Sequence, residues 1–179
     1  VGVDVFFVLS GYLITGLIRH EVLLTRGFDY RRFMLRRTAR LLPALMAFLA
    51  VFAILAPFAA PAAGVMRAVV WTALYASNYA RALTSAVDLL QHGWSLATEM
   101  QFYLIWPVAA VALSLRPRLA LPAILSAWLA VTIWRGAAYE LIGWEYAYYA
   151  GDTRLSGLLA GAALVFLPDG LRTRLGQSS

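Results

Sequence analysis

Cysteine and lysine are both absent from the 179 residues of this chain, and acidic residues are few. Without cysteine there can be no disulfide bond and no thiolate metal site. The nine acidic residues face 15 basic ones, all arginine, so the formal net charge is +6. Histidine occurs only twice, and no pair of residues has a metal-ligand spacing such as His-x-x-x-His, so we expect no bound metal.

Apolar residues are abundant instead: they make up 62% of the chain, while charged residues make up 13%. A soluble domain is roughly half apolar and about a quarter charged. The excess predicts a protein that is solvated by a lipid bilayer. In such a protein, arginine charge indicates membrane topology or an anionic ligand, so we expect no nucleic-acid partner.

Several apolar runs approach the length that a membrane-crossing helix needs. They cover residues 2–18, 41–60, 65–82, 97–115, 119–133 and 155–167. The third run is short and amphipathic, which leaves open whether it crosses fully. We predict an all-α, polytopic transmembrane helix bundle with about five or six membrane segments. No internal repeat or linker divides it, so residues 1–179 are expected to form one partial membrane domain.

The chain begins at Val1, inside an apolar run, without an initiating methionine or a signal peptide. We therefore expect a fragment that lacks a part upstream of Val1. The densest basic segment, 31–40, is placed in the cytoplasm by the positive-inside rule. If the run 65–82 does not cross, residues 94–99 and 144–154 lie on the opposite side; if it crosses, the later assignments reverse.

Glu99 stands out because it lies near the head of the fourth apolar run. A carboxylate at the head of a membrane-length helix is energetically costly unless it is paired or hydrated, so Glu99 is a candidate functional residue. Asp4 has a similar place in the first run. Its position can also be explained as a helix N-terminus, where the helix dipole favours a negative charge.

Arg36, Arg37 and Arg40 lie just before the second apolar run. At helical spacing, Arg36 and Arg40 share one face. The planar guanidinium group suits bidentate binding of phosphate. Two interpretations stay open: an arginine anchor that only sets topology, as most charge runs do, or a clamp for the phosphates of a cofactor or an anionic lipid headgroup.

Two further polar residues have two interpretations each. His92 could share a pocket with Glu99 and act as a base near neutral pH, or it could be an ordinary loop histidine. Arg154 opens the last apolar run, where a cation opposes the helix dipole, so it is expected to have an anionic partner. Glu99 is one candidate for that partner, and a purely structural salt bridge is the alternative.

Small residues favour close helix packing in membranes. Ser10 and Gly11 offer such a face on the first apolar run, and Gly16 would extend it. Gly157 and Gly161 offer a second face on the last run. We expect both faces to lie against neighbouring helices.

Four segments together resemble the acyltransferase family 3 membrane proteins. They are GVDVFFVLSGYLI at 2–14, FMLRRTARLLP at 33–43, WSLATEMQFY at 94–103, and a weaker one formed by Thr153 and Arg154 with Gly157 and Gly161. Their order and spacing also fit, and the resemblance covers nearly the whole chain. The first and third segments together make it specific.

The resemblance implies an integral-membrane O-acyltransferase of the bacterial inner (plasma) membrane. It also implies about ten helices in all, so that this chain is a fragment truncated at both ends. Such an enzyme moves an acyl group, often acetyl, from acyl-CoA to a hydroxyl of a sugar or glycoconjugate, as in polysaccharide, lipopolysaccharide or peptidoglycan. Its partners would be the lipid bilayer, the co-substrate acyl-CoA (acetyl-CoA) and the glycan acceptor, with no bound cofactor. A transporter or a non-catalytic membrane scaffold is the alternative, since either would also accept charged residues within the membrane.

The resemblance also implies residue roles. Arg36, Arg37 and Arg40 would bind the donor. Asp4 and Glu99 would be catalytic, alongside a principal histidine upstream of Val1. The acceptor pocket would contain His92, Trp94, Ser95, Gln101, Tyr103 and Arg154. The family commonly has a second glutamate after Glu99, and this chain has Met100 there, so Glu99 is the one carboxylate expected to act at that point.

Overall fold

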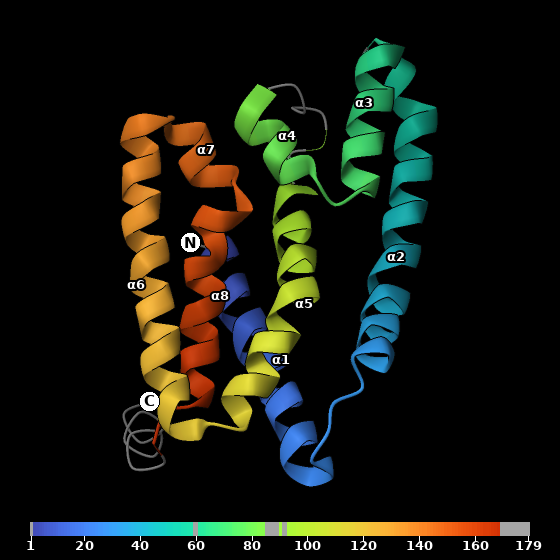
Figure 1. Ribbon diagram of the computed structural model, residues 1–179. Coiled ribbons are helices and arrows are strands. Elements are labelled where there is room, and N and C mark those ends of the chain that lie inside the picture. Colours follow the sequence, from blue (N-terminus) through green and yellow to red (C-terminus); the bar gives the residue numbers. More distant parts are fainter. Residues whose placement is uncertain (1, 59–60, 85–89, 91–92, 169–179) are drawn as a thin grey trace. The chain divides into compact units, whose positions relative to one another are not determined.

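The computed structural model describes residues 2–58, 61–84, 90 and 93–168, and over these residues the chain is helical with no strand (Figure 1). The elements are α1 (Gly2–Thr25), α2 (Tyr30–Leu55), the short 3₁₀ turn η1 (Ala56–Phe58), α3 (Ala62–Ala73), α4 (Ser77–Thr84), α5 (Gly93–Ser114), α6 (Pro117–Leu141), α7 (Trp144–Tyr149) and α8 (Gly151–Val165).

Four of the described helices are long and apolar enough to cross a membrane: α1, α2 continued through η1, α5 and α6. A shorter apolar helix lies within α3. The predicted all-α, multi-pass membrane architecture is therefore confirmed. The last apolar run belongs to α8, which at 15 residues is shorter than a straight crossing of the bilayer requires.

The apolar run 65–82 is divided into two helices, so it does not cross as one. α3 ends at Ala73 and the chain turns at Tyr75, whose φ of 52° lies in the left-handed region. The Tyr75 and Ala76 amides donate back to the carbonyls of Thr72 and Trp71, which closes the last turn of the helix. A bulky residue rarely adopts this conformation.

The basic segment 31–40, called the arginine segment below, is part of a membrane helix and does not merely precede one. α2 begins at Tyr30, and the Asp29 side chain caps it by accepting a 2.9 Å hydrogen bond from the Arg32 amide. Arg36, Arg37 and Arg40 therefore extend rigidly from the same helix that carries the apolar run. The first apolar run is likewise extended, because α1 continues past it to Thr25.

The chain divides into two compact units, which are described here separately. The first unit comprises residues 1–28, 106–132 and 155–179. In it, α1 lies directly against α8: a Cβ atom on Gly11 would overlap the Leu158 carbonyl, and one on Gly161 would overlap the Val8 carbonyl. Both predicted small-residue faces are thus confirmed. The predicted extension to Gly16 is wrong among the described residues, because none of their atoms lies within 4 Å of a Cβ placed there.

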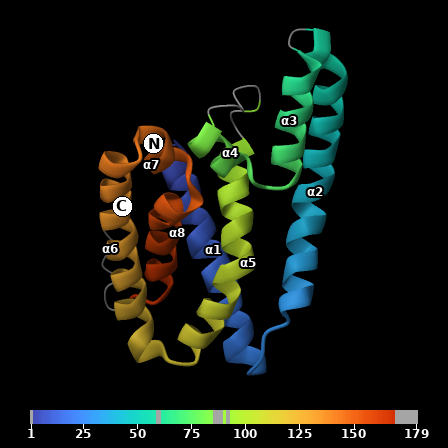
Figure 2. The same ribbon diagram turned by 45° about the horizontal axis from the view of Figure 1, so that its top comes forward.

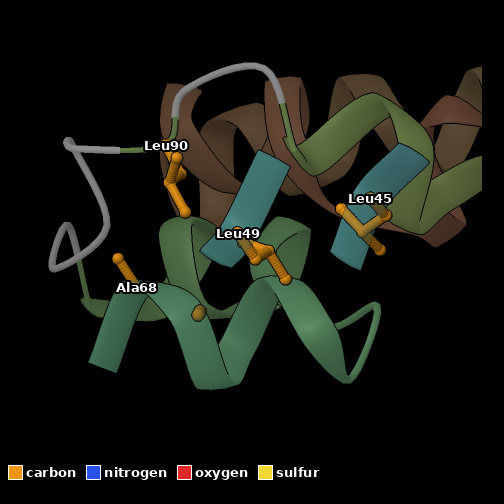
Figure 3. Packing of buried hydrophobic residues seen from close by; sticks show 5 residues of the cluster. Leu45, Leu49, Ala68 and Leu90 are labelled. Atoms are coloured by element: carbon orange, nitrogen blue, oxygen red, sulfur yellow. The ribbon is translucent and has the colours of Figure 1, made fainter. Parts of the chain in front are cut away.

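The second unit comprises residues 29–105 and 133–154. Figures 1 and 2 show α3 beside the end of α2 that is farther along the chain. Between these helices and α4 lies a buried apolar cluster (Figure 3). Its members are Leu45, Leu49, Ala68, Ala80 and Leu90. This packing anchors the apolar part of α2 within the unit that also holds most of the predicted site residues.

Candidate functional site

Most of the predicted site residues belong to the second unit, on α2, α5 and the first turn of α8. Asp4 belongs to the first unit, where it is exposed in the first turn of α1. That position is one where the helix dipole stabilises a carboxylate. His92 lies outside the described residues.

Glu99 is buried on α5, with 5% of its surface exposed. Its carboxylate accepts a hydrogen bond from the Tyr103 hydroxyl, four residues later on the same helix face. Burying a carboxylate is costly unless such donors compensate for lost hydration. Met100, beside it, is also buried, with 6% exposure.

Tyr103 connects this carboxylate to the arginine segment. The Arg37 guanidinium lies 5.8 Å from the centre of the Tyr103 ring and 5.7 Å from that of Phe33. Phe33 and Tyr103 themselves meet edge to face at 6.3 Å. Arg37 is half-buried, while Arg36 and Arg40 are exposed on α2. A predicted donor-binding residue and a predicted catalytic residue thus contact the same phenol ring.

Arg154 is buried at the start of α8, with 4% exposure. Its Nε donates a 2.6 Å hydrogen bond to the Tyr148 carbonyl. The guanidinium lies 4.0 Å from the centre of the Tyr148 ring and 5.5 Å from that of Trp94. Cation–π contacts of this kind are strongest where the cation is desolvated. The pairing of Arg154 with Glu99 stays a prediction.

An aromatic cluster surrounds Arg154. Trp94 lies 5.5 Å from both Tyr148 and Tyr149, and Trp144 lies 6.2 and 6.0 Å from the same two rings. Arg81 contributes a second cation, 4.3 Å from the Tyr149 ring centre. Trp94 and Tyr149 are buried, whereas Trp144 and Tyr148 are exposed, so the cluster extends from the interior of the unit to its surface.

Tyr148, Tyr149 and Arg81 also belong to this cluster, and none of them is among the site residues predicted from the sequence. The segment 134–149 is aromatic and polar, as at a membrane–water interface, and that composition accounts for its aromatic residues without a contact to Trp94. The recurrence of aromatic residues immediately before Arg154 was the available signal.

The side-chain amides of Gln101 and Asn78 form a reciprocal pair of hydrogen bonds. The Gln101 Nε2 donates to the Asn78 Oδ1 at 3.0 Å, and the Gln101 Oε1 accepts from the Asn78 Nδ2 at 3.1 Å. The same Nε2 also donates to the Tyr75 carbonyl at 2.9 Å. Gln101 thereby joins α5 to the start of α4. Ser95 lies half-buried in the first turn of α5.

Asp152, which precedes Arg154 by two residues, accepts hydrogen bonds from three helices. The donors are Trp134 Nε1 at 2.7 Å, Tyr146 hydroxyl at 3.2 Å and Tyr79 hydroxyl at 3.4 Å. Burial, followed by the negative charge of Asp152, raises the pKa of Tyr79 and that of Tyr146 above the usual phenol value. Both phenols are therefore held neutral as hydrogen-bond donors.

Comparison with known proteins places these residues in a family context. The family model described as an acyltransferase domain matches residues 1–176. The chain is 34% identical to the peptidoglycan O-acetyltransferase OatA of Listeria monocytogenes, over 93% of this chain and 29% of that protein. It is 33% identical to the O-acetyltransferase OatA of Staphylococcus aureus strain NCTC 8325, over 93% of this chain and 30% of that protein.

A third relative is the putative peptidoglycan O-acetyltransferase YrhL of Bacillus subtilis, 35% identical over 93% of this chain and 28% of that protein. The chain thus spans less than a third of the length of each of these relatives. No solved structure matches it.

Proposed function

Since this chain belongs to the acyltransferase family, with residues 1–176 matching its domain, we propose that it is part of an integral-membrane enzyme that transfers an acyl group to a sugar hydroxyl. The main support for this proposal is the position of Tyr103 between two predicted site residues. Its hydroxyl bonds Glu99 while its ring contacts Arg37, so the proposed donor side and acceptor side meet within one compact unit.

We propose acyl-CoA, in the first instance acetyl-CoA, as the donor. Its phosphates would bind Arg36, Arg37 and Arg40, since guanidinium groups form charge-assisted bidentate hydrogen bonds with phosphate. Arg36 and Arg40 are exposed, as a binding residue must be. Arg37 is half-buried against two rings, and this contact would hold its side chain in one orientation.

We propose a glycan as the acceptor, and peptidoglycan as its first candidate because two of the relatives are named for it. Sugars have apolar faces that pack on aromatic rings, and hydroxyl groups that bond to charged side chains. The cluster of Trp94, Trp144 and Tyr148 around Arg154 offers both kinds of contact. Its exposed rings give a sugar access to it from the surface of the unit.

In the proposed reaction, the acceptor hydroxyl attacks the thioester carbonyl of the donor. A carbon–oxygen bond forms, the carbon–sulfur bond breaks, and the hydroxyl proton passes through a general base to the departing thiolate. The family resemblance assigns the base to a histidine upstream of Val1, with Asp4 orienting it. The arginines position the donor, and Glu99 and Trp94 shape the acceptor side.

The test uses the full-length protein that contains this chain, in membranes supplied with acetyl-CoA and peptidoglycan fragments. Arg37→Ala should raise the KM for acetyl-CoA by about tenfold or more, because a charge-assisted hydrogen bond contributes roughly 1.5–3 kcal/mol. Arg118→Ala is the matched control, since Arg118 is an exposed arginine of the first unit. Normal expression with an unchanged KM in Arg37→Ala would contradict the donor assignment.

A further inference from the structure

Asp152 joins elements that are distant in sequence. Its carboxylate sits in the first turn of α8 and accepts from Trp134 on α6, Tyr146 on α7 and Tyr79 on α4. All three donors are neutral N–H or O–H groups. An ionised carboxylate suits this set because it has only acceptor sites and enough of them for three donors. The helix dipole also favours its negative charge at this position.

The Asp152 carboxylate and the Arg154 guanidinium both form hydrogen bonds with residues of α7. Asp152 bonds the side chain of Tyr146, and Arg154 bonds the backbone carbonyl of Tyr148. Both contacts therefore join α7 to the first turn of α8. Tyr146 and Tyr148 lie on the same short helix, α7, and Tyr148 supplies the carbonyl and the ring that hold the Arg154 guanidinium.

The start of α8 is constrained on a second side by Gly151. A Cβ atom there would lie 2.6 Å from the Gln101 Oε1 and 3.1 Å from the Asn78 Nδ2. The backbone therefore lies directly on the amide pair that joins α4 and α5. With Asp152 bonded on one side and Gly151 packed on the other, the first turn of α8 has little freedom to shift.

We propose that Asp152 is a positioning residue for acyl transfer: through its three aromatic donors it fixes the first turn of α8, so that Arg154 is held over Tyr148 and Trp94, where a sugar acceptor would bind. The role in transfer rests on the proposed function. The fixing of the segment does not, because it follows from the hydrogen bonds alone.

The first experiment is a double-mutant cycle in the full-length protein, with acetyl-CoA and peptidoglycan fragments as substrates. Asp152→Asn keeps the shape but replaces one carboxylate oxygen with an N–H₂ donor, so either Tyr79 or the pair Trp134 and Tyr146 loses its acceptor. We expect it to lower kcat/KM for the fragments by about tenfold, as small misplacements of binding groups do. The KM for acetyl-CoA should stay within about twofold, since the donor arginines lie on another helix.

Arg154→Gln supplies the second arm of the cycle. If Asp152 acts through Arg154, adding Asp152→Asn to Arg154→Gln should cost less than about twofold more. Fully additive losses would overturn the positioning role. Glu140→Gln is the matched carboxylate-to-amide control, because Glu140 is exposed on α6, and it should leave transfer unchanged. Should Asp152→Asn fail to fold, Tyr146→Phe and Trp134→Phe each remove a single donor and serve in the same cycle.

The second experiment does not depend on activity. Amide hydrogen exchange over residues 144–154 should be faster in Asp152→Asn than in the wild type or in Glu140→Gln, while exchange over 30–55 stays the same. Unchanged exchange in 144–154 would overturn the proposal even if transfer falls. A wild-type protein with no transfer at all would instead overturn the proposed function, and the exchange result would still decide whether Asp152 fixes the segment.

Discussion

The Tyr103 hydroxyl donates a hydrogen bond to the Glu99 carboxylate one helical turn earlier on α5. Both side chains are buried, with 4% and 5% of their surfaces exposed. The phenol thus replaces part of the hydration that Glu99 loses in the interior. The ring of the same residue contacts Arg37. Tyr103 therefore has two contacts, one through its hydroxyl and one through its ring, and a substitution can remove one and keep the other.

Tyr103→Phe separates these two contacts. It removes the hydroxyl from Glu99 and keeps an aromatic ring for Arg37. We expect the free energy of unfolding to fall by about 1–3 kcal/mol, because a buried carboxylate loses a donor. In the full-length protein we expect transfer to the glycan to fall as well, with little change in the KM for acetyl-CoA. Thermal unfolding in detergent and initial-rate measurements provide the two readouts.

Tyr139→Phe is the control for this substitution, because Tyr139 is 57% exposed on α6. It should change neither quantity. If both variants behave alike, the hydroxyl of Tyr103 has no particular role in supporting Glu99.

Gly11→Ala should destabilise the first unit. The added methyl group would overlap the backbone carbonyl of Leu158, and a backbone atom cannot move aside as the end of a side chain can. Overpacking of this kind costs about 1–3 kcal/mol. We therefore expect a lower midpoint of thermal unfolding and less protein recovered from the membrane fraction.

Gly16→Ala tests the same idea on the same helix with the opposite expectation. In the part of the chain that the structure describes, no atom lies within 4 Å of a Cβ atom at this position. Alanine is the better helix former by roughly 1 kcal/mol, so this variant should be as stable as the wild type or more so. A loss of stability in Gly16→Ala would mean that helix α1 does not tolerate substitution for reasons unrelated to packing on α8.

Stability should fall at alkaline pH through Tyr79 and Tyr146. Burial and then Asp152 raise the pKa of each phenol in the folded state, so the unfolded chain loses these protons first. Their contribution to stability is present below the ordinary phenol pKa of about 10 and is lost as pH rises through the higher folded value. Unfolding followed across this range should depend less on pH in the Tyr79→Phe, Tyr146→Phe double variant. An equal dependence would show that other groups control alkaline unfolding.

The contacts that sequence reasoning could predict are mainly those within one helix. Glu99 and Tyr103 are four residues apart, so their shared face follows from helical spacing. Gly11 and Gly161 were expected to lie in close helix contacts because small residues mark such surfaces. The contact of Arg37 with Tyr103 joins two helices, and no spacing along the chain encodes it.

The contacts of Asp152 could not be predicted from the sequence for a second reason. Beside an apolar run, Asp152 has the sequence pattern of a helix N-terminus, and that local interpretation points to no partner elsewhere in the chain. Its three donors come from residues 79, 134 and 146, so only the folded unit brings them together. The break in the run 65–82 was also hidden, because Tyr75 is not a residue whose type suggests a left-handed turn.

Pro43 lies inside α2, between the arginines and the buried residues Leu45 and Leu49. Proline has no amide hydrogen, so the helix lacks one of its backbone hydrogen bonds at this point. The helix is nevertheless held on both sides of this point: Phe33 and Arg37 contact Tyr103 of α5, while Leu45 and Leu49 belong to the buried apolar cluster. Packing of both halves of α2 within the second unit therefore compensates for the backbone hydrogen bond that Pro43 cannot make.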